Sequence, residues 1–160
     1  MAEINDFSRE ADPYNLARFL EAQSGSVRGS DYKTALSELQ AGRKRSHWIW
    51  YIFPQIEGLG STDYAVRFSI KSLDEARTYL AHPILGPRLI ECAEAVLAIE
   101  GRSAVQIFGD IDRMKLRSSM TLFAQVTGSD SVFTLVLEKY FYGEPDSRTI
   151  SILNGVTAQT

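Results

Sequence analysis

Residues 48–53 read WIWYIF, and this stretch decides between an all-helical and a mixed fold. Aromatic and β-branched residues of this kind are favoured in strands. A single strand cannot form a sheet, however, and no partner strand is visible elsewhere in the chain. Ser46 also stands where it can cap a helix. The fold class is therefore predicted to be mainly α, with residues 48–53 forming either a short helix or an extended segment.

Helix-capping residues lie N-terminal to this stretch. Asp12 followed by Pro13 predicts a helix start, because the carboxylate accepts from free backbone amides and proline needs no donor at that position. Asp31 or Ser30 predicts a second start, and Gly42 predicts the end of that helix. Two helices are expected before the aromatic stretch.

The C-terminal part of the chain carries similar signals. Ser72 and Glu75 have the spacing of a capping box, and Pro87 predicts the start of a long helix. Gly109 separates a short turn from the next helix, and residues 147–153, SRTISIL, predict the last one. About seven or eight helices are expected in total.

Composition predicts one folded domain. The 160 residues include 44% hydrophobic and 23% charged residues, which is the balance of a globular protein rather than of a disordered chain. No linker divides the sequence, so residues 1–160 are expected to form a single helical domain. The 11 N-terminal residues and the last few residues are expected to be flexible.

Net charge, targeting signals and cysteine count exclude several classes of protein. A net charge of −3 argues against general nucleic-acid binding, and no apolar stretch approaches the roughly 18 residues that a membrane-spanning helix needs. The single Cys92 cannot form an intramolecular disulfide, and two histidines without a cysteine partner predict no metal site. We expect a cytoplasmic protein without a cofactor, whose protein partner, if any, is unknown.

Three motifs in order resemble a known bacterial family. They are HWIWYIFPQIEGLG at 47–60, SLDEARTYLAHPILGPRL at 72–89 and KLRSSMTLFA at 115–124. The chain is similar to the domain of unknown function 1810 from about Asp12 to Leu153. Some members of that family are called calpastatin, but calpastatins are disordered inhibitors and this composition is globular. The resemblance implies a compact helical fold, with a distant link to proteins that handle NAD and ADP-ribose and cleave N-glycosidic bonds.

Cationic and aromatic residues lie side by side at 43–53. Guanidinium groups bind phosphate or carboxylate, His47 can carry a proton near neutral pH, and indole rings can stack on a base. The candidate ligand-binding residues of this segment are Arg43, Lys44, Arg45, Trp48 and Trp50. The same residues also fit a structural interpretation, with cations at a helix end and aromatics in the core.

A second candidate segment lies in KLRSSMTLFA. On a helix, Lys115, Ser118 and Ser119 fall within one turn of each other, so a cation and two hydroxyls can be presented together. This combination favours binding of phosphate or another polar group over nucleophilic catalysis by serine. An ordinary exposed polar face is the alternative.

Carboxylates complete the candidate site. Cleavage of an N-glycosidic bond passes through an oxocarbenium-like state, which a carboxylate stabilises or whose attacking water it activates. Glu57 and Asp63 flank the turn after the aromatic cluster, and with His47 they are the candidate catalytic residues, although both carboxylates also fit roles in turns or caps.

The sequence therefore supports two hypotheses. The first is a protein that binds a small anionic, nucleotide-like ligand between residues 43–60 and 112–121 and hydrolyses an ADP-ribose-type glycosidic bond. The second is a non-enzymatic protein-interaction module that uses the basic and aromatic patch at 43–53. Whether the protein is an enzyme stays open at this point.

Overall fold

A computed structural model describes residues 12–155, which form nine helices. Seven of them have at least seven residues, and the all-α fold class is confirmed. The helices are α2 (Ala17–Gln23), α3 (Tyr32–Gln40), α4 (Ile49–Ile52), α5 (Asp63–Arg67), α6 (Leu73–Ala81), α7 (Leu85–Ala98), α8 (Ala104–Thr127), α9 (Val132–Phe141) and α10 (Ser147–Leu153). The predicted flexibility of the two chain ends falls on residues outside this range.

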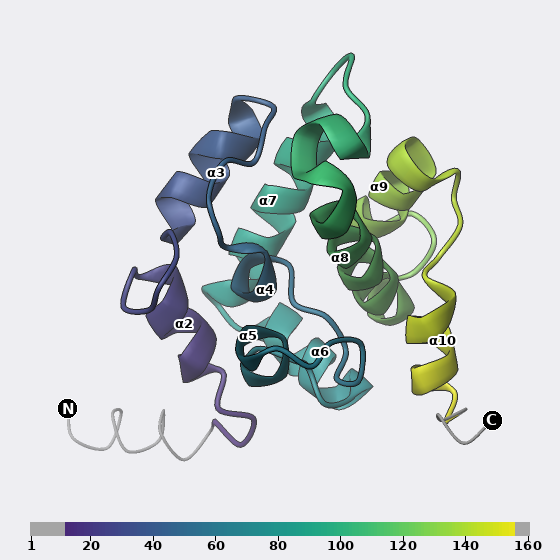
Figure 1. Cartoon of the computed structure of the whole chain (residues 1–160). Coiled ribbons are helices and arrows are strands. Elements are labelled where there is room, and N and C mark those ends of the chain that lie inside the picture. Colours follow the sequence, from purple (N-terminus) through teal and green to yellow (C-terminus); the bar gives the residue numbers. More distant parts are fainter. Residues whose placement is uncertain (1–11, 156–160) are drawn as a thin grey trace.

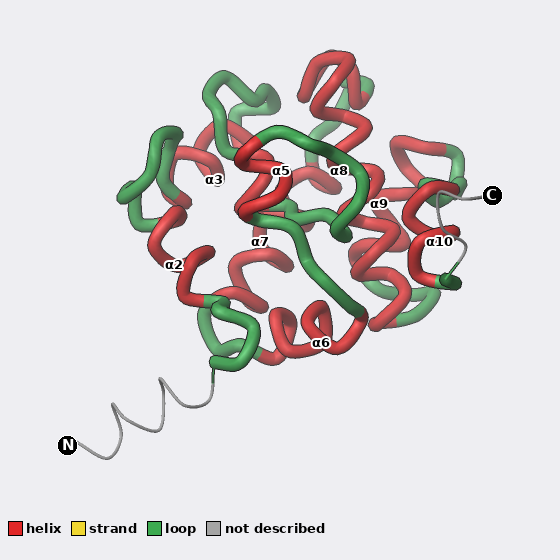
Figure 2. Tube along the Cα trace, turned by 60° about the horizontal axis from the view of Figure 1, so that its bottom comes forward, coloured by secondary structure: helices red, strands yellow, loops and turns green. Residues whose placement is uncertain are grey.

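The long helix α9 packs against both α7 and α8, and the shorter helices lie around these three. α3 lies against α7, α6 contacts both α7 and α8, and α10 packs on α8 (Figure 1). The one-turn helix α4 contacts α2 on one side and α8 on the other. Figure 2 shows that the described chain consists of helices and loops. The aromatic stretch thus lies where the N-terminal helices meet α8.

Residues 48–53 form a core turn and not a strand. Ile49–Ile52 is a single helical turn, and the side chains of Trp48, Tyr51 and Phe53 are fully buried. Ser46 does not cap this turn, because its hydroxyl donates to Glu38 instead. Within residues 12–155 the one β contact is an isolated parallel bridge between Ile56 and Ile70. The apolar character of the stretch reflects burial on several sides rather than membership of a sheet.

Several predicted helix boundaries are confirmed because their caps are local. Asp31 accepts from the Thr34 amide, and Ser72 accepts from the Glu75 amide. The last helix spans Ser147–Leu153 as expected, with Asp146 as its cap. Gly109 breaks α8 with a φ of 86° and a ψ of 169°, so the predicted division between a short turn and a longer helix is present.

Other boundaries differ from the prediction. Asp12 accepts from the backbone amides of Leu16 and Ala17, so the first regular helix begins four residues later than Pro13. The helix α5 was not predicted; Thr62 caps it by accepting from the Ala65 amide. These short elements depend on tertiary contacts as much as on their own sequence.

No helix of the described residues is long and apolar enough to cross a membrane.

Candidate functional site

Glu38 organises the basic and aromatic segment from α3. Its carboxylate accepts from the backbone amides of Arg45 and Ser46 at 2.8 and 3.0 Å, from the Ser46 hydroxyl at 2.6 Å and from the Trp48 indole nitrogen at 2.8 Å. Burial alone raises the pKa of Glu38, but these hydrogen bonds outweigh it and hold the pKa below the usual value of 4.5. Glu38 therefore fixes the path of residues 45–48.

This lowered pKa predicts a pH-dependent contribution to stability. A carboxylate with a lower pKa in the folded chain stabilises it fully above about pH 4.5, and this contribution disappears as the pH falls through the folded-state pKa. We expect Glu38→Gln to lower the free energy of unfolding by about 1–2 kcal/mol at pH 7, with the difference shrinking below pH 4. Urea unfolding at several pH values measures this difference, with Glu94→Gln, at an exposed position of α7, as the control. A difference from wild type that stays constant from pH 7 to pH 3 would contradict the assignment.

Asp112 joins the two segments that the sequence singled out. Its carboxylate lies 2.8 Å from the Lys44 ammonium and 3.2 Å from the Lys115 ammonium. Lys44 also donates to the Ser46 carbonyl and lies over the Trp48 ring, with only 7% of its side chain exposed. Lys44 is therefore a structural cation, whereas Lys115 is the more accessible member of the cluster.

Lys115 lines a cavity of about 590 Å³ between α8, α10 and the loop after α4. Trp50 and Ser118 line it as well, and Ser118 donates its hydroxyl to the Met114 carbonyl. Arg148 contributes a second cation, for which no ion pair is present among residues 12–155. Two cations and an indole ring thus meet in what we term the Lys115 cavity.

A second cavity of about 720 Å³ adjoins the first, and we term it the His47 cavity. Trp50 and Thr62 line both cavities, and His47 and Asp63 line the second together with Arg28 and Tyr64. The Trp50 and Tyr64 rings meet edge to face, with centroids 5.2 Å apart. The hydroxyl of Tyr64 donates to the Arg28 carbonyl at 2.8 Å. The walls of this cavity are therefore fixed by specific contacts.

The other predicted site residues line neither cavity. Arg43 and Arg45 are exposed on the loop after α3, and Trp48 is fully buried in the core. Ser119 is fully buried, and its hydroxyl has no hydrogen-bond partner among the described residues. The Glu57 carboxylate lies 3.9 Å from the Lys71 ammonium, and both side chains are about half exposed. The structure thus brings together Trp50, Lys115 and Ser118 in one cavity, and His47, Asp63 and Trp50 in the next.

Several contributors to the site were not identified from the sequence, among them Arg28 and Thr62. Glu38 is a single acidic residue on α3 with no motif around it. Arg148 lies in the segment 147–153, for which the sequence predicted a helix but no site. Tyr64 belongs to α5, which was not predicted. The Thr62–Asp63 pair, a capping residue followed by an acid, was the available signal for that helix.

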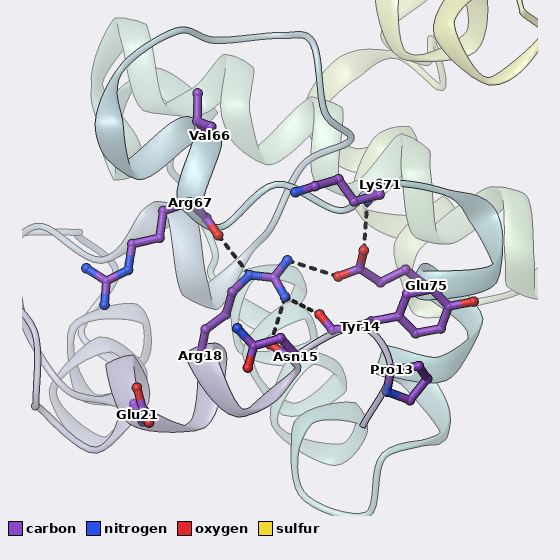
Figure 3. Close-up of a pocket in the computed structure, with 9 residues that line it drawn as sticks. All are labelled: Pro13, Tyr14, Asn15, Arg18, Glu21, Val66, Arg67, Lys71 and Glu75. Atoms are coloured by element: carbon purple, nitrogen blue, oxygen red, sulfur yellow. Dashed lines mark hydrogen bonds and ion pairs between the residues drawn. The ribbon is translucent and has the colours of Figure 1, made fainter. Parts of the chain in front are cut away.

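A third cavity, beside α2, is a structural site. Arg18 lies in it, and Figure 3 shows its guanidinium surrounded by acceptors. All five of its N–H groups have a partner, since five donor–acceptor pairs link it to the carbonyls of Tyr14, Asn15, Arg67 and Ser69 and to the Glu75 carboxylate. Arg18 has no donor left for a ligand.

Metal and thiol chemistry have no built site in this part of the chain. Across residues 12–155, no group of three His, Cys, Asp or Glu side chains is placed to hold a metal ion. Cys92 is buried in α7, and burial raises the pKa of its thiol to about 12. The thiol is therefore protonated and inaccessible at neutral pH.

The fold defines an all-α domain with two adjoining cavities lined by polar and aromatic side chains. The chain belongs to the family described as "Protein of unknown function (DUF1810)", which matches residues 13–153. Its structure is similar to the crystal structure of the conserved hypothetical protein Rv1873 from Mycobacterium tuberculosis, with a TM-score of 0.84 and 49% sequence identity. That match covers 89% of this chain and 99% of the other. A comparison with curated proteins gives no match.

Proposed function

We propose that this protein binds a small anionic ligand carrying a flat ring, such as a nucleotide, in the Lys115 cavity. The proposal rests on one observation: Lys115, Arg148 and Trp50 line the same cavity of about 590 Å³. Cavities of about 300–1,000 Å³ with a few convergent polar groups are typical of small-molecule sites. Cations recognise the anionic end, and the indole face supports the ring.

The charges around the cavity favour an anion. Asp112 is shared between Lys44 and Lys115, so this cluster keeps one net positive charge. Asp110 is paired with Arg113 at 3.0 Å, and Asp146 accepts from the amide and hydroxyl of Thr149. Asp146 also lines the cavity and keeps its negative charge, because its partners at Thr149 are neutral, so it offsets Arg148. One net positive charge therefore remains around the cavity.

The interaction-module hypothesis receives less support. It requires both tryptophans and the neighbouring cations on one exposed surface, but Trp48 is fully buried and Lys44 is almost completely so. Interaction hot spots are enriched in aromatic residues and arginine that a partner can reach. A concave site around Trp50 fits a small ligand better.

Hydrolysis of an N-glycosidic bond is the reaction we propose for the adjoining His47 cavity. Asp63 and His47 both line it beside Trp50. In such a reaction water adds to the anomeric carbon, the C–N bond breaks, and the base leaves with a proton. Asp63 is suited to accept a proton from the water, and His47 is suited to donate one to the leaving base. Glu57 lies outside this cavity and has no part in the proposal.

Binding is tested by titrating the protein with AMP, ADP-ribose and NAD in a calorimeter. We expect binding of at least one of them, and Lys115→Gln should weaken it about tenfold or more, because a charge-assisted hydrogen bond contributes about 1.5–3 kcal/mol. Trp50→Phe should remove the ligand-induced change in tryptophan fluorescence, since Trp48 is buried. Chromatography of the same mixtures shows whether the glycosidic bond is cleaved, because the released base separates from the intact ligand.

The matched control is Lys33→Gln, the same change on the exposed surface of α3 and away from both cavities. It should leave affinity unchanged. Absence of binding across the panel, without any shift in melting temperature, would overturn the proposed function. Binding without bond cleavage would retain the ligand and remove the hydrolytic reaction.

A further inference from the structure

The Lys115 and His47 cavities share a wall, and this arrangement bears on the size of the ligand. Both are lined by Trp50 and Thr62, so the two cavities are direct neighbours. We propose that the two cavities are halves of one site for a dinucleotide, a ligand with two nucleoside-sized ends joined through phosphate. This inference rests on the proposed binding of nucleotide-like anions and specifies their size.

The space available is larger than one nucleotide requires. The cavities measure about 590 and 720 Å³, and each alone lies within the range of about 300–1,000 Å³ that serves a whole small ligand. A mononucleotide held at Lys115 would leave the His47 cavity filled with water. A ligand with two ends uses both spaces.

Groups that recognise nucleotides are present in both halves. Lys115 and Arg148 lie in one half, and Arg28 and His47 lie in the other. Trp50 lines both halves, and its ring meets that of Tyr64 edge to face, with an interplanar angle of 89°. Each half therefore offers donors for phosphate together with Trp50, on whose ring a base can stack.

The shared wall is held in place rather than mobile. Tyr64 is tied to the Arg28 carbonyl at 2.8 Å, and the Tyr51 hydroxyl donates to the Ser30 carbonyl at 2.6 Å. The Thr62 hydroxyl accepts from the Ala65 amide at the start of α5. The two halves are thus preorganised at a fixed separation, and a rigid site loses little affinity to ordering.

A fixed pair of half-sites predicts a gain from linking. Once one end of a dinucleotide is bound, the other end meets its half-site at a high effective concentration, without a second loss of translational freedom. The affinity for a dinucleotide should therefore exceed that for a mononucleotide by about tenfold or more. A protein with only one half-site should bind a dinucleotide and a mononucleotide with similar affinity.

The test compares AMP with the 5′-phosphorylated dinucleotide pApA by calorimetry on the full chain. Wild type is expected to bind pApA at least about tenfold more tightly than AMP. Arg28→Gln, in the His47 cavity, should weaken pApA and leave AMP unchanged, whereas Lys115→Gln should weaken both. Circular dichroism and melting temperature confirm that each variant is folded, and Lys33→Gln again serves as the control.

The outcomes separate the two proposals. Equal affinity for AMP and pApA, or an Arg28→Gln variant that binds pApA as wild type does, would overturn the dinucleotide site and leave the proposed anion binding standing. If neither ligand binds, both proposals fail. A tenfold preference that Arg28→Gln abolishes supports the joined site.

Discussion

Arg18→Ala is expected to lower the free energy of unfolding by about 3–5 kcal/mol, because it leaves a buried carboxylate without its cation. The Arg18–Glu75 ion pair measures 2.9 Å, and the Glu75 side chain is only 1% exposed. The same guanidinium donates to four backbone carbonyls, those of Tyr14 and Asn15 before α2, of Arg67 at the end of α5 and of Ser69 just after it. Figure 3 shows the partners Tyr14, Asn15, Arg67 and Glu75 around it. Urea unfolding followed by circular dichroism measures the loss.

An exposed ion pair provides the matched control. Arg77 and Asp74 form a 2.8 Å pair on α6, with 57% and 75% of their side chains exposed. Exposed pairs of this kind contribute about 0–1 kcal/mol, so Arg77→Ala should change stability little. The double variant Arg18→Met/Glu75→Leu should be less damaging than Arg18→Ala, because no charge is left buried. Equal effects of Arg18→Ala and Arg77→Ala would show that the buried pair has no special role.

Gly29→Ala is the second change with a large expected effect, about 2–6 kcal/mol. Gly29 has a φ of 128°, and a methyl group there would overlap the Tyr51 hydroxyl and lie 2.5 Å from the His47 carbonyl oxygen. Backbone strain accounts for about 1–3 kcal/mol of the effect and steric overlap for a similar amount. Because Gly29 lines the His47 cavity, the variant should also lose affinity for dinucleotides.

Gly101→Ala separates the two causes. Gly101 also has a positive φ, of 75°, but a methyl group there meets nothing within 4 Å. It should show only the strain contribution and unchanged ligand binding. Both variants are compared by urea unfolding. If Gly29→Ala costs no more than Gly101→Ala, the loop at 28–30 is not packed against residues 47–51 as described.

The helices that could be predicted from sequence are those with local caps. Asp31, Ser72 and Asp146 each accept from an amide three residues later, and this geometry needs no information from the rest of the chain. The helix α5 has a local cap as well, since Thr62 accepts from the Ala65 amide, but a five-residue helix needs packing to form. The late start of α2 follows from Asp12, which accepts from the amides of Leu16 and Ala17. The predicted capping box of Ser72 and Glu75 is only half present. Ser72 caps the helix locally, but the Glu75 carboxylate accepts from the Lys71 amide and pairs with the distant Arg18 instead of the Ser72 amide.

The candidate site was less predictable because it depends on which way each side chain faces. Trp48 and Trp50 are two positions apart and point in roughly opposite directions on a helical turn, so one enters the core and the other lines the cavities. Ser118 and Ser119 are separated by about 100° around α8, and only Ser118 lines a cavity. Periodicity indicates that such pairs differ, but the packing of α8 and α10 determines which member is inside.

Because Cys92 is buried, its reaction with a thiol reagent reports on transient opening of the structure. The sequence contains one cysteine, and its thiol lies in the interior of α7 with a pKa raised to about 12. A thiol reagent can therefore modify the native protein only after α7 separates from its neighbours. The rate of labelling measures that separation in the unmodified chain, without a fluorophore or an added mutation.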